Sequence, residues 1–275
     1  MKKILLAFDG GHYSVGALEF AKELNNAEPI MLAGAFLPQI DFSSLWSHSG
    51  GGKAGNLFIP TLEDENAEMV KVNMDQFSGY CTEHKIDFRI HKDFYDFALP
   101  ELRKETRFAD LLIISSETFY GHLAKEPPND YLKEILHSAE CPILVIPEKF
   151  EFPRKNILAY DGTEASVYAI KQFTYLFPQF ANNETVLFHL KAHEEEVIPQ
   201  KENISELASR HFKNLDIVSL KLDYRHEFLA WLSGFVAPIL VSGSFSRSAV
   251  SGMFKKSFVT GVIGEHKVPV FVAHR

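Results

Sequence analysis

Short, uninterrupted runs of hydrophobic residues alternate along this chain with longer segments in which hydrophobic residues recur every three or four positions. The short runs, such as 111–114 (LLII) and 239–241 (ILV), are typical of strands in a parallel sheet that helices cover on both faces. The longer segments repeat with the period of a helix, as Leu18, Ala21 and Leu24 do. The alternation of the two patterns predicts an α/β fold.

The predicted elements fall into two similar series. The first has strands at 3–8, 30–36, 86–92, 110–115 and 142–146, and helices at 14–25, 62–84, 97–107 and 130–139. The second has strands at 156–160, 184–190, 216–222, 238–242 and 269–273, and helices at 166–176, 201–212, 224–236 and 249–264. Each series predicts a doubly wound, mostly parallel, Rossmann-like sheet of five strands.

The two series begin with a sequence repeat. Residues 4–18 (ILLAFDGGHYSVGAL) and 157–170 (ILAYDGTEASVYAI) both run from a hydrophobic strand through Asp-Gly to Ser-Val and an alanine. Asp9 therefore corresponds to Asp161. A repeat of this length indicates two copies of one structural unit.

The two series also end alike, because 141–145 (CPILV) parallels 268–272 (VPVFV). The spacing between the matching starts and ends is about 25 residues longer in the first series. We assign the excess to the Ser- and Gly-rich segment 37–60, as an insertion. The repeat predicts two tandem domains, 1–150 and 151–275.

Composition narrows the classes of partner and compartment. The 275 residues include 28 Lys and Arg against 36 Asp and Glu, a net charge of −8, which argues against nucleic acid as a partner. The two cysteines, Cys81 and Cys141, are too few for a disulfide framework and favour a reducing cytoplasm. The uncharged stretch 228–246 is long enough to span a bilayer, but Pro238 lies within it. We expect a helix that ends before Pro238 and then a buried strand, with no membrane association.

The repeat resembles the universal stress protein family, and in particular its tandem two-domain members. The resemblance rests on the strand–Asp-Gly–Ser-x-x-Ala opening, the Pro-aliphatic last strand and the loop after the fourth strand. It implies a regulatory, non-enzymatic protein that binds an adenine nucleotide such as ATP, and it implies self-association, including dimers. In nucleotide-binding members that loop reads G-x-x-G-(x9)-G-[ST]. In this chain the implied ligand set of the second domain is Asp161 near adenine and ribose, Gly243 for close approach, and Ser244, Ser246, Lys256 and Ser257 around phosphate.

The chain departs from the family loop in both domains. In the second, Ser246 and Lys256 stand where the second and third glycines are expected, although the lysine could itself attract phosphate. In the first, the loop contains acidic residues such as Glu117, and Asp9 alone remains of the ligand set. We therefore expect any nucleotide in the second domain, and a structural role for the turn at Asp9 in capping the helix near Ser14.

Two other functions stay open. The first is a scaffold or interaction module whose pockets have lost nucleotide, and the second is an enzyme of the wider adenine nucleotide α-hydrolase group. The sequence provides no recognisable catalytic set for the second. His189 and His193 have a spacing of four, but a solvated acidic loop fits them better than a metal site, and we predict no metal ligand.

The last strands of the two series predict how the domains meet. Both 142–146 and 269–273 are short and hydrophobic, and an exposed edge of this kind invites uncontrolled pairing. We expect the two strands to pair with each other inside one chain, in a pseudo-two-fold arrangement.

Overall fold

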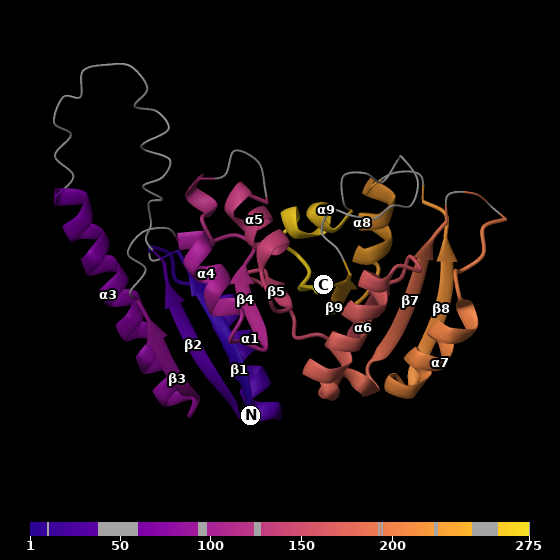
Figure 1. Ribbon diagram of the computed structural model, residues 1–275, viewed down its shortest axis with the longest axis horizontal. Coiled ribbons are helices and arrows are strands. Elements are labelled where there is room, and N and C mark those ends of the chain that lie inside the picture. The colour runs from indigo at the N-terminus through magenta and orange to yellow at the C-terminus, as the bar shows by residue number, and fades with distance from the viewer. Residues whose placement is uncertain are drawn as a thin grey trace, which may run out of the picture.

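Ten strands form one continuous sheet in the computed structural model (Figure 1). The residues that the structure describes are 1–9, 11–37, 60–92, 98–123, 128–191, 193, 195–222, 225–243 and 258–274. Below, the first half means residues 1–150 and the second half means residues 151–275. The α/β fold class predicted from the hydrophobic pattern is confirmed.

The first half follows the predicted order of elements. Its strands are β1 (Lys2–Phe8), β2 (Ile30–Phe36), β3 (Asp87–His91), β4 (Leu111–Ser115) and β5 (Ile143–Ile146). Its helices are α1 (Val15–Ala27), α3 (Pro60–Glu83), α4 (Ala98–Thr106), the short 3-10 helix η1 (Gly121–Leu123) and α5 (Asp130–Ser138). The expected insertion at 37–60 lies almost wholly outside the described residues.

The second half repeats this order. Its strands are β6 (Lys155–Ala159), β7 (Glu184–Leu190), β8 (Asn214–Leu220), β9 (Pro238–Ser242) and β10 (Val270–Val272). Its helices are α6 (Glu164–Leu176), the 3-10 helix η2 (Pro178–Asn182), α7 (Lys201–His211), α8 (Arg225–Ser233) and α9 (Phe258–Gly264). Only the end of the helix expected at 249–264 is described.

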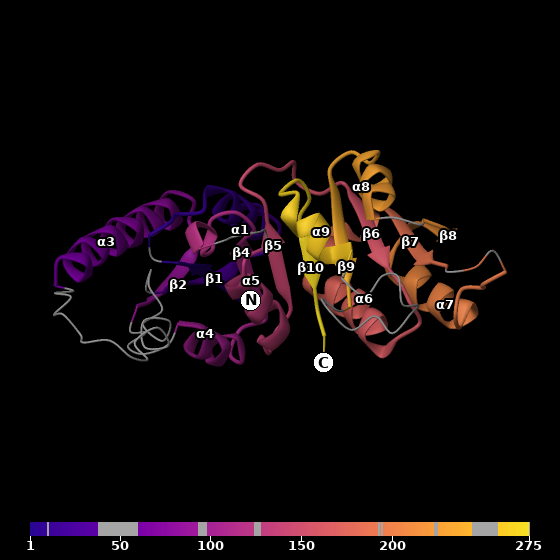
Figure 2. The same cartoon turned by 90° about the horizontal axis from the view of Figure 1, so that it is seen from above.

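The sheet has the strand order β3-β2-β1-β4-β5-β10-β9-β6-β7-β8. Neighbouring strands are parallel within each half, whereas β5 and β10 are antiparallel, with Ile143 opposite Val272 and Val145 opposite Val270. Figure 2 shows these two strands side by side at the centre of the molecule. The predicted pairing of the last strands is confirmed, and it joins the two five-stranded sheets into one.

Two hydrophobic cores cover the two faces of the sheet, and both continue across the β5–β10 junction. One core combines helical residues of α1, α3, α6 and α7 and includes Leu144 and Phe271. The other combines helical residues of α4, α5, α8 and α9 and includes Val145 and Val270. Side chains that alternate along β5 and β10 thus contribute to opposite faces. The halves share their cores as well as a strand pair.

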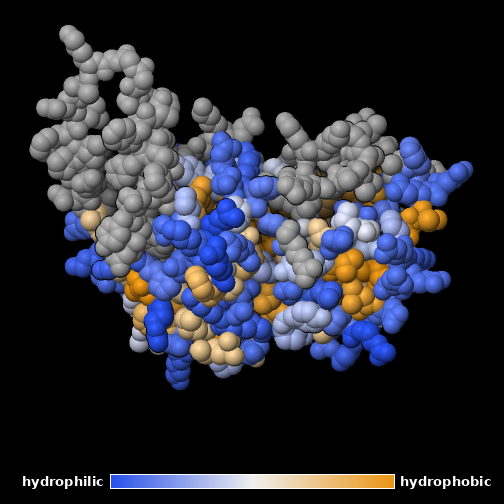
Figure 3. All heavy atoms as spheres, viewed as in Figure 1, coloured by the Kyte–Doolittle hydropathy of each residue, from blue (hydrophilic) through white to orange (hydrophobic). Residues whose placement is uncertain are grey.

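The uncharged stretch 228–246 folds as expected from its proline. Helix α8 ends at Ser233, and Pro238 begins the buried strand β9. Within the described ranges, no helix combines the length and the hydrophobicity needed to cross a membrane. On the face shown in Figure 3, hydrophilic residues cover most of the described surface, with small hydrophobic areas between them.

Candidate functional site

The turn after β6 holds Asp161 in a fixed position. Its Oδ1 atom accepts hydrogen bonds from the backbone N–H of Thr163 at 3.0 Å and from the Thr163 hydroxyl at 2.6 Å. Gly162 between them has a φ of +81°, which favours glycine. Among the described residues, Oδ2 of Asp161 has no hydrogen-bond partner, so it remains available to a ligand.

Gly243 follows β9 and packs against the start of α6. A Cβ atom at this position would lie 2.2 Å from the carbonyl carbon of Ala165 and 2.3 Å from the backbone nitrogen of Ser166. Helix packing alone therefore explains the glycine, which the sequence analysis assigned to close approach of phosphate. The other predicted phosphate contacts, Ser244, Ser246, Lys256 and Ser257, lie outside the described residues.

A groove of about 1320 Å³ opens beside this turn. Gly162, Thr163 and the exposed side of α6 form one wall, and residues of α4, α5 and the segment after α5 form the other. Arg103, Lys171, His137 and His274 bring basic groups to it, and Glu134, Glu140 and Glu164 bring acidic ones. Glu140 pairs with Arg107 at 2.7 Å, and this hydrogen bond lowers the pKa of the Glu140 carboxyl. The groove is large enough for a nucleotide.

The corresponding place in the first half is occupied by the chain itself. One oxygen of Glu148, in the loop after β5, accepts hydrogen bonds from the hydroxyls of Ser14 at 2.5 Å and Ser115 at 2.7 Å. Its other oxygen accepts the backbone N–H of Gly16 at 3.1 Å. The start of α1 therefore already holds a carboxylate, where a helix N-terminus could otherwise bind an anion. In the repeat, Glu148 corresponds to Arg275, which lies outside the described residues.

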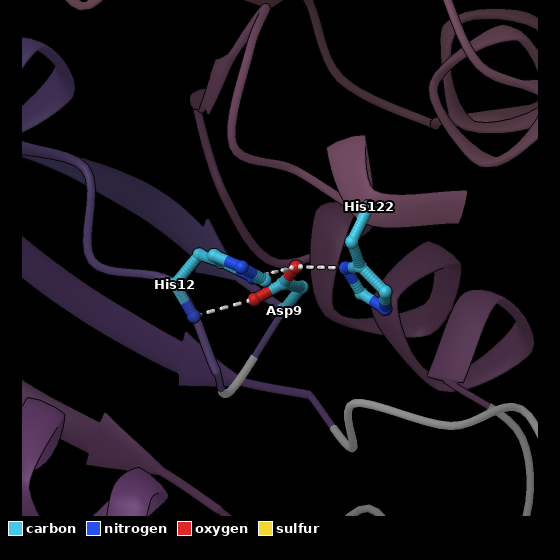
Figure 4. Close-up of side chains that lie close together, drawn as sticks. All are labelled: Asp9, His12 and His122. Carbon is cyan, nitrogen blue, oxygen red and sulfur yellow. Dashed lines mark hydrogen bonds and ion pairs between the residues drawn. The ribbon is translucent and has the colours of Figure 1, made fainter. Parts of the chain in front are cut away.

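Three further side chains meet at the end of β1. Asp9 lies between the rings of His12 and His122 (Figure 4). Its Oδ2 atom is 2.7 Å from Nδ1 of His12 and 3.4 Å from Nδ1 of His122. The two rings stack with centroids 5.0 Å apart. Among the described residues this is a group with the composition and spacing of a metal site.

Only Asp9 of this group could be expected from the sequence. The turn at Asp9 is ordered by Oδ1, which accepts the backbone N–H groups of Gly11 and His12, but the predicted capping of α1 is done by Ser14 and not by this turn. His122 was missed, since it is more than a hundred residues away and lies in η1, after β4. The predicted doubly wound fold was the available signal, because β4 lies beside β1 in the sheet and their carboxyl ends meet at one edge.

Several other titratable groups are satisfied within the fold. His189 was expected in a solvated acidic loop, but it is buried at the end of β7. Its Nδ1 atom lies 3.0 Å from the carbonyl oxygen of Tyr160, and its Nε2 atom lies 3.4 Å from the Glu196 carboxylate. Both cysteines are free thiols, and burial raises the pKa of each to about 12. Neither thiol has the lowered pKa of a reactive cysteine.

Comparison with known proteins identifies the architecture. No protein-family model matches the sequence, and the curated proteins include no match. A solved structure of a universal stress protein from Archaeoglobus fulgidus aligns with 100% of this chain and 96% of its own, with a TM-score of 0.69 and 16% identity. This chain has the universal stress protein fold. The resemblance predicted from the repeat is thus confirmed in three dimensions.

Two Pseudomonas aeruginosa structures align over the whole chain as well. One comes from strain PAO1 and has no known function. The alignment covers 92% of that protein, with a TM-score of 0.54 and 14% identity. The other comes from strain UCBPP-PA14 and is assigned to the universal stress proteins. The alignment covers 93% of that protein, with a TM-score of 0.52 and 13% identity. At these identities the universal stress protein likeness establishes the fold, and the ligand has to be argued from the site itself.

Proposed function

We propose that this chain is a tandem universal stress protein that binds an adenine nucleotide in its second half and acts as a binding or regulatory protein. The nucleotide would lie at the carboxyl end of β6, with Asp161 toward the adenine and ribose. Ser244, Ser246, Lys256 and Ser257 would surround the phosphates. Ligands of doubly wound sheets bind at this edge, outside the carboxyl ends of the strands.

The observation that carries this proposal is the asymmetry between the two halves. Beside Asp161 the described chain leaves a groove of about 1320 Å³, whereas the Glu148 carboxylate sits on the start of α1 in the first half. A phosphate at α1 would have to displace that carboxylate and would be repelled by Glu117, whose side chain accepts the backbone N–H of Glu148. One nucleotide per chain is the stoichiometry that follows.

Calorimetric titration of ATP into the purified chain tests the proposal. We expect one site, and at least about tenfold weaker binding in the Asp161→Asn variant, because a neutral amide accepts hydrogen bonds from ribose hydroxyls less strongly than a carboxylate. The matched Asp9→Asn variant, which makes the same change at the corresponding position of the first half, should bind ATP as the unaltered chain does. Equal losses in the two variants would contradict the asymmetric site.

A second function is supported by the loop sequence itself. Ser246 and Lys256 replace two of the three family glycines, and side chains there hinder close approach of backbone to phosphate. A scaffold without nucleotide would show no ATP binding in the titration and no nucleotide released from freshly purified protein by denaturation, as judged by mass spectrometry. We assign no catalytic step to either half. Two cysteines that form no disulfide support a reducing, cytoplasmic location for both functions.

A further inference from the structure

We propose that Asp9, His12 and His122 bind one divalent transition-metal ion, of which Zn²⁺ is the best match, in the first half. The site is separate from the groove at Asp161 and does not depend on nucleotide binding. Each residue offers one ligand atom, and these atoms all lie within 4.8 Å of one another. Figure 4 shows both imidazole rings directed at the same carboxylate.

The distances from the Asp9 carboxylate to the two histidine rings are close to those of a metal site. Bonds of about 2.0–2.2 Å in tetrahedral geometry place neighbouring ligand atoms about 3.4 Å apart. Oδ2 of Asp9 already lies 3.4 Å from Nδ1 of His122. Its distance of 2.7 Å to Nδ1 of His12 is that of a hydrogen bond, so His12 would need to move by less than about 1 Å. That ring is 40% exposed, which leaves it room to move.

The carboxylate is held in place by the backbone around it. Asp9 is fully buried, and its Oδ1 atom accepts hydrogen bonds from the backbone N–H groups of Gly11 at 3.1 Å and His12 at 2.7 Å. The N–H of Tyr120 points to Oδ2 at 3.2 Å. Tyr120 has a φ of +52°, a left-handed backbone conformation that residues other than glycine rarely adopt. Hydrogen bonds of this kind orient a ligating carboxylate, and here they hold Oδ2 toward the two imidazole rings.

The donor set selects the class of ion. Imidazole nitrogen with carboxylate oxygen suits zinc and other first-row transition metals, whereas magnesium and calcium prefer oxygen alone. A single carboxylate cannot neutralise two imidazolium rings 5.0 Å apart, but two neutral imidazoles and one carboxylate suit a dication. His12 and His122 are 40% and 29% exposed, so the ion can enter from solvent and keep a water or an anion as a further ligand.

The test uses the full chain, freed of metal with a chelator and titrated calorimetrically with Zn²⁺. We expect one equivalent of Zn²⁺ per chain, with affinity at least tenfold lower in both His12→Ala and His122→Ala. Co²⁺ titration adds a spectroscopic readout, because tetrahedral Co²⁺ with nitrogen ligands absorbs strongly in the visible range, and both variants should lose that band. Circular dichroism shows whether each variant is folded.

His91→Ala is the matched control. His91 pairs with Glu105 at 2.9 Å, a histidine–carboxylate contact without a second histidine, so this variant should bind Zn²⁺ as the unaltered chain does. The chain has twelve histidines, and binding that persists in both His12→Ala and His122→Ala would place the ion elsewhere and overturn the proposal. So would the absence of Zn²⁺ binding in the unaltered chain. Neither result changes the expected ATP titration of the second half, so the zinc proposal can be wrong while the nucleotide proposal holds.

Discussion

At Gly243, a single added carbon atom would lie 2.2 Å from the backbone of Ala165 at the start of α6. Backbone cannot rotate away as a flexible side chain can, so the loop after β9 must shift. We predict that Gly243→Ala lowers the free energy of unfolding by about 1–3 kcal/mol, as overpacking in a core does. Urea denaturation of nucleotide-free protein measures this, and unchanged stability would contradict the close contact.

Gly79 supplies the control for this prediction. It lies within α3, and a Cβ there meets no atom within 4 Å. Gly79→Ala should therefore raise stability, by up to about 1 kcal/mol, since alanine favours the helix. It follows that loss of ATP binding on substitution of Gly243 cannot be attributed to a lost phosphate contact, and Asp161 is the residue on which the nucleotide site is better tested.

At the scale of elements, Glu148 ties the loop after β5 to the beginning of α1 and the end of β4. Glu148→Ala would leave the Gly16 N–H and the hydroxyls of Ser14 and Ser115 without this acceptor. We predict a loss of about 1–3 kcal/mol in unfolding free energy, measured by urea denaturation. Glu151→Ala, an exposed change in the next segment, should stay within about 0.5 kcal/mol. Equal stabilities of the two variants would show that the Glu148 contacts contribute little.

Elements differ in how far the sequence determines them. Strands β2, β7 and β9 match the predicted ranges residue for residue, because continuous hydrophobic runs mark strands that are buried on both faces. Strand β8 was displaced by two residues, from 216–222 to Asn214–Leu220. It lies at the edge of the sheet, where exposed positions alternate with partly buried ones and the run has no sharp boundary.

The candidate sites were harder to predict than the strands. Asp9 and Asp161 could be found, because each one follows the first strand of its copy of a visible repeat. His122 could not be placed from spacing alone, since its position depends on the loop after β4 and on η1. Glu148 was missed for the same reason, as its partners come from two segments distant in sequence, 14–16 and 115–117. Side chains carried by loops are positioned by tertiary contacts, which local patterns do not contain.

At the scale of the whole molecule, the two halves depend on each other. The β5–β10 pair is flanked by polar contacts between the halves, Nδ1 of His266 to the Ser116 hydroxyl at 2.9 Å and Nε2 of His274 to the carbonyl oxygen of His137 at 3.1 Å. Phe20 of α1 also packs against the ring of Phe152 in the second half, with ring centroids 5.1 Å apart. Separation would expose a strand edge and part of each core in both halves.

We therefore predict that residues 1–150 and 151–275, expressed separately, will not remain monomeric. Strands β5 and β10 are fully buried in the intact chain, and each would become an exposed hydrophobic edge. The nearest replacement partner is the same strand of a second copy, which restores an antiparallel pair about a two-fold axis. Light scattering over a range of concentrations, with the intact chain as the control, measures the outcome. Dimers or larger species of each half would support the shared strand pair, whereas two folded monomers would show that each half is stable without it.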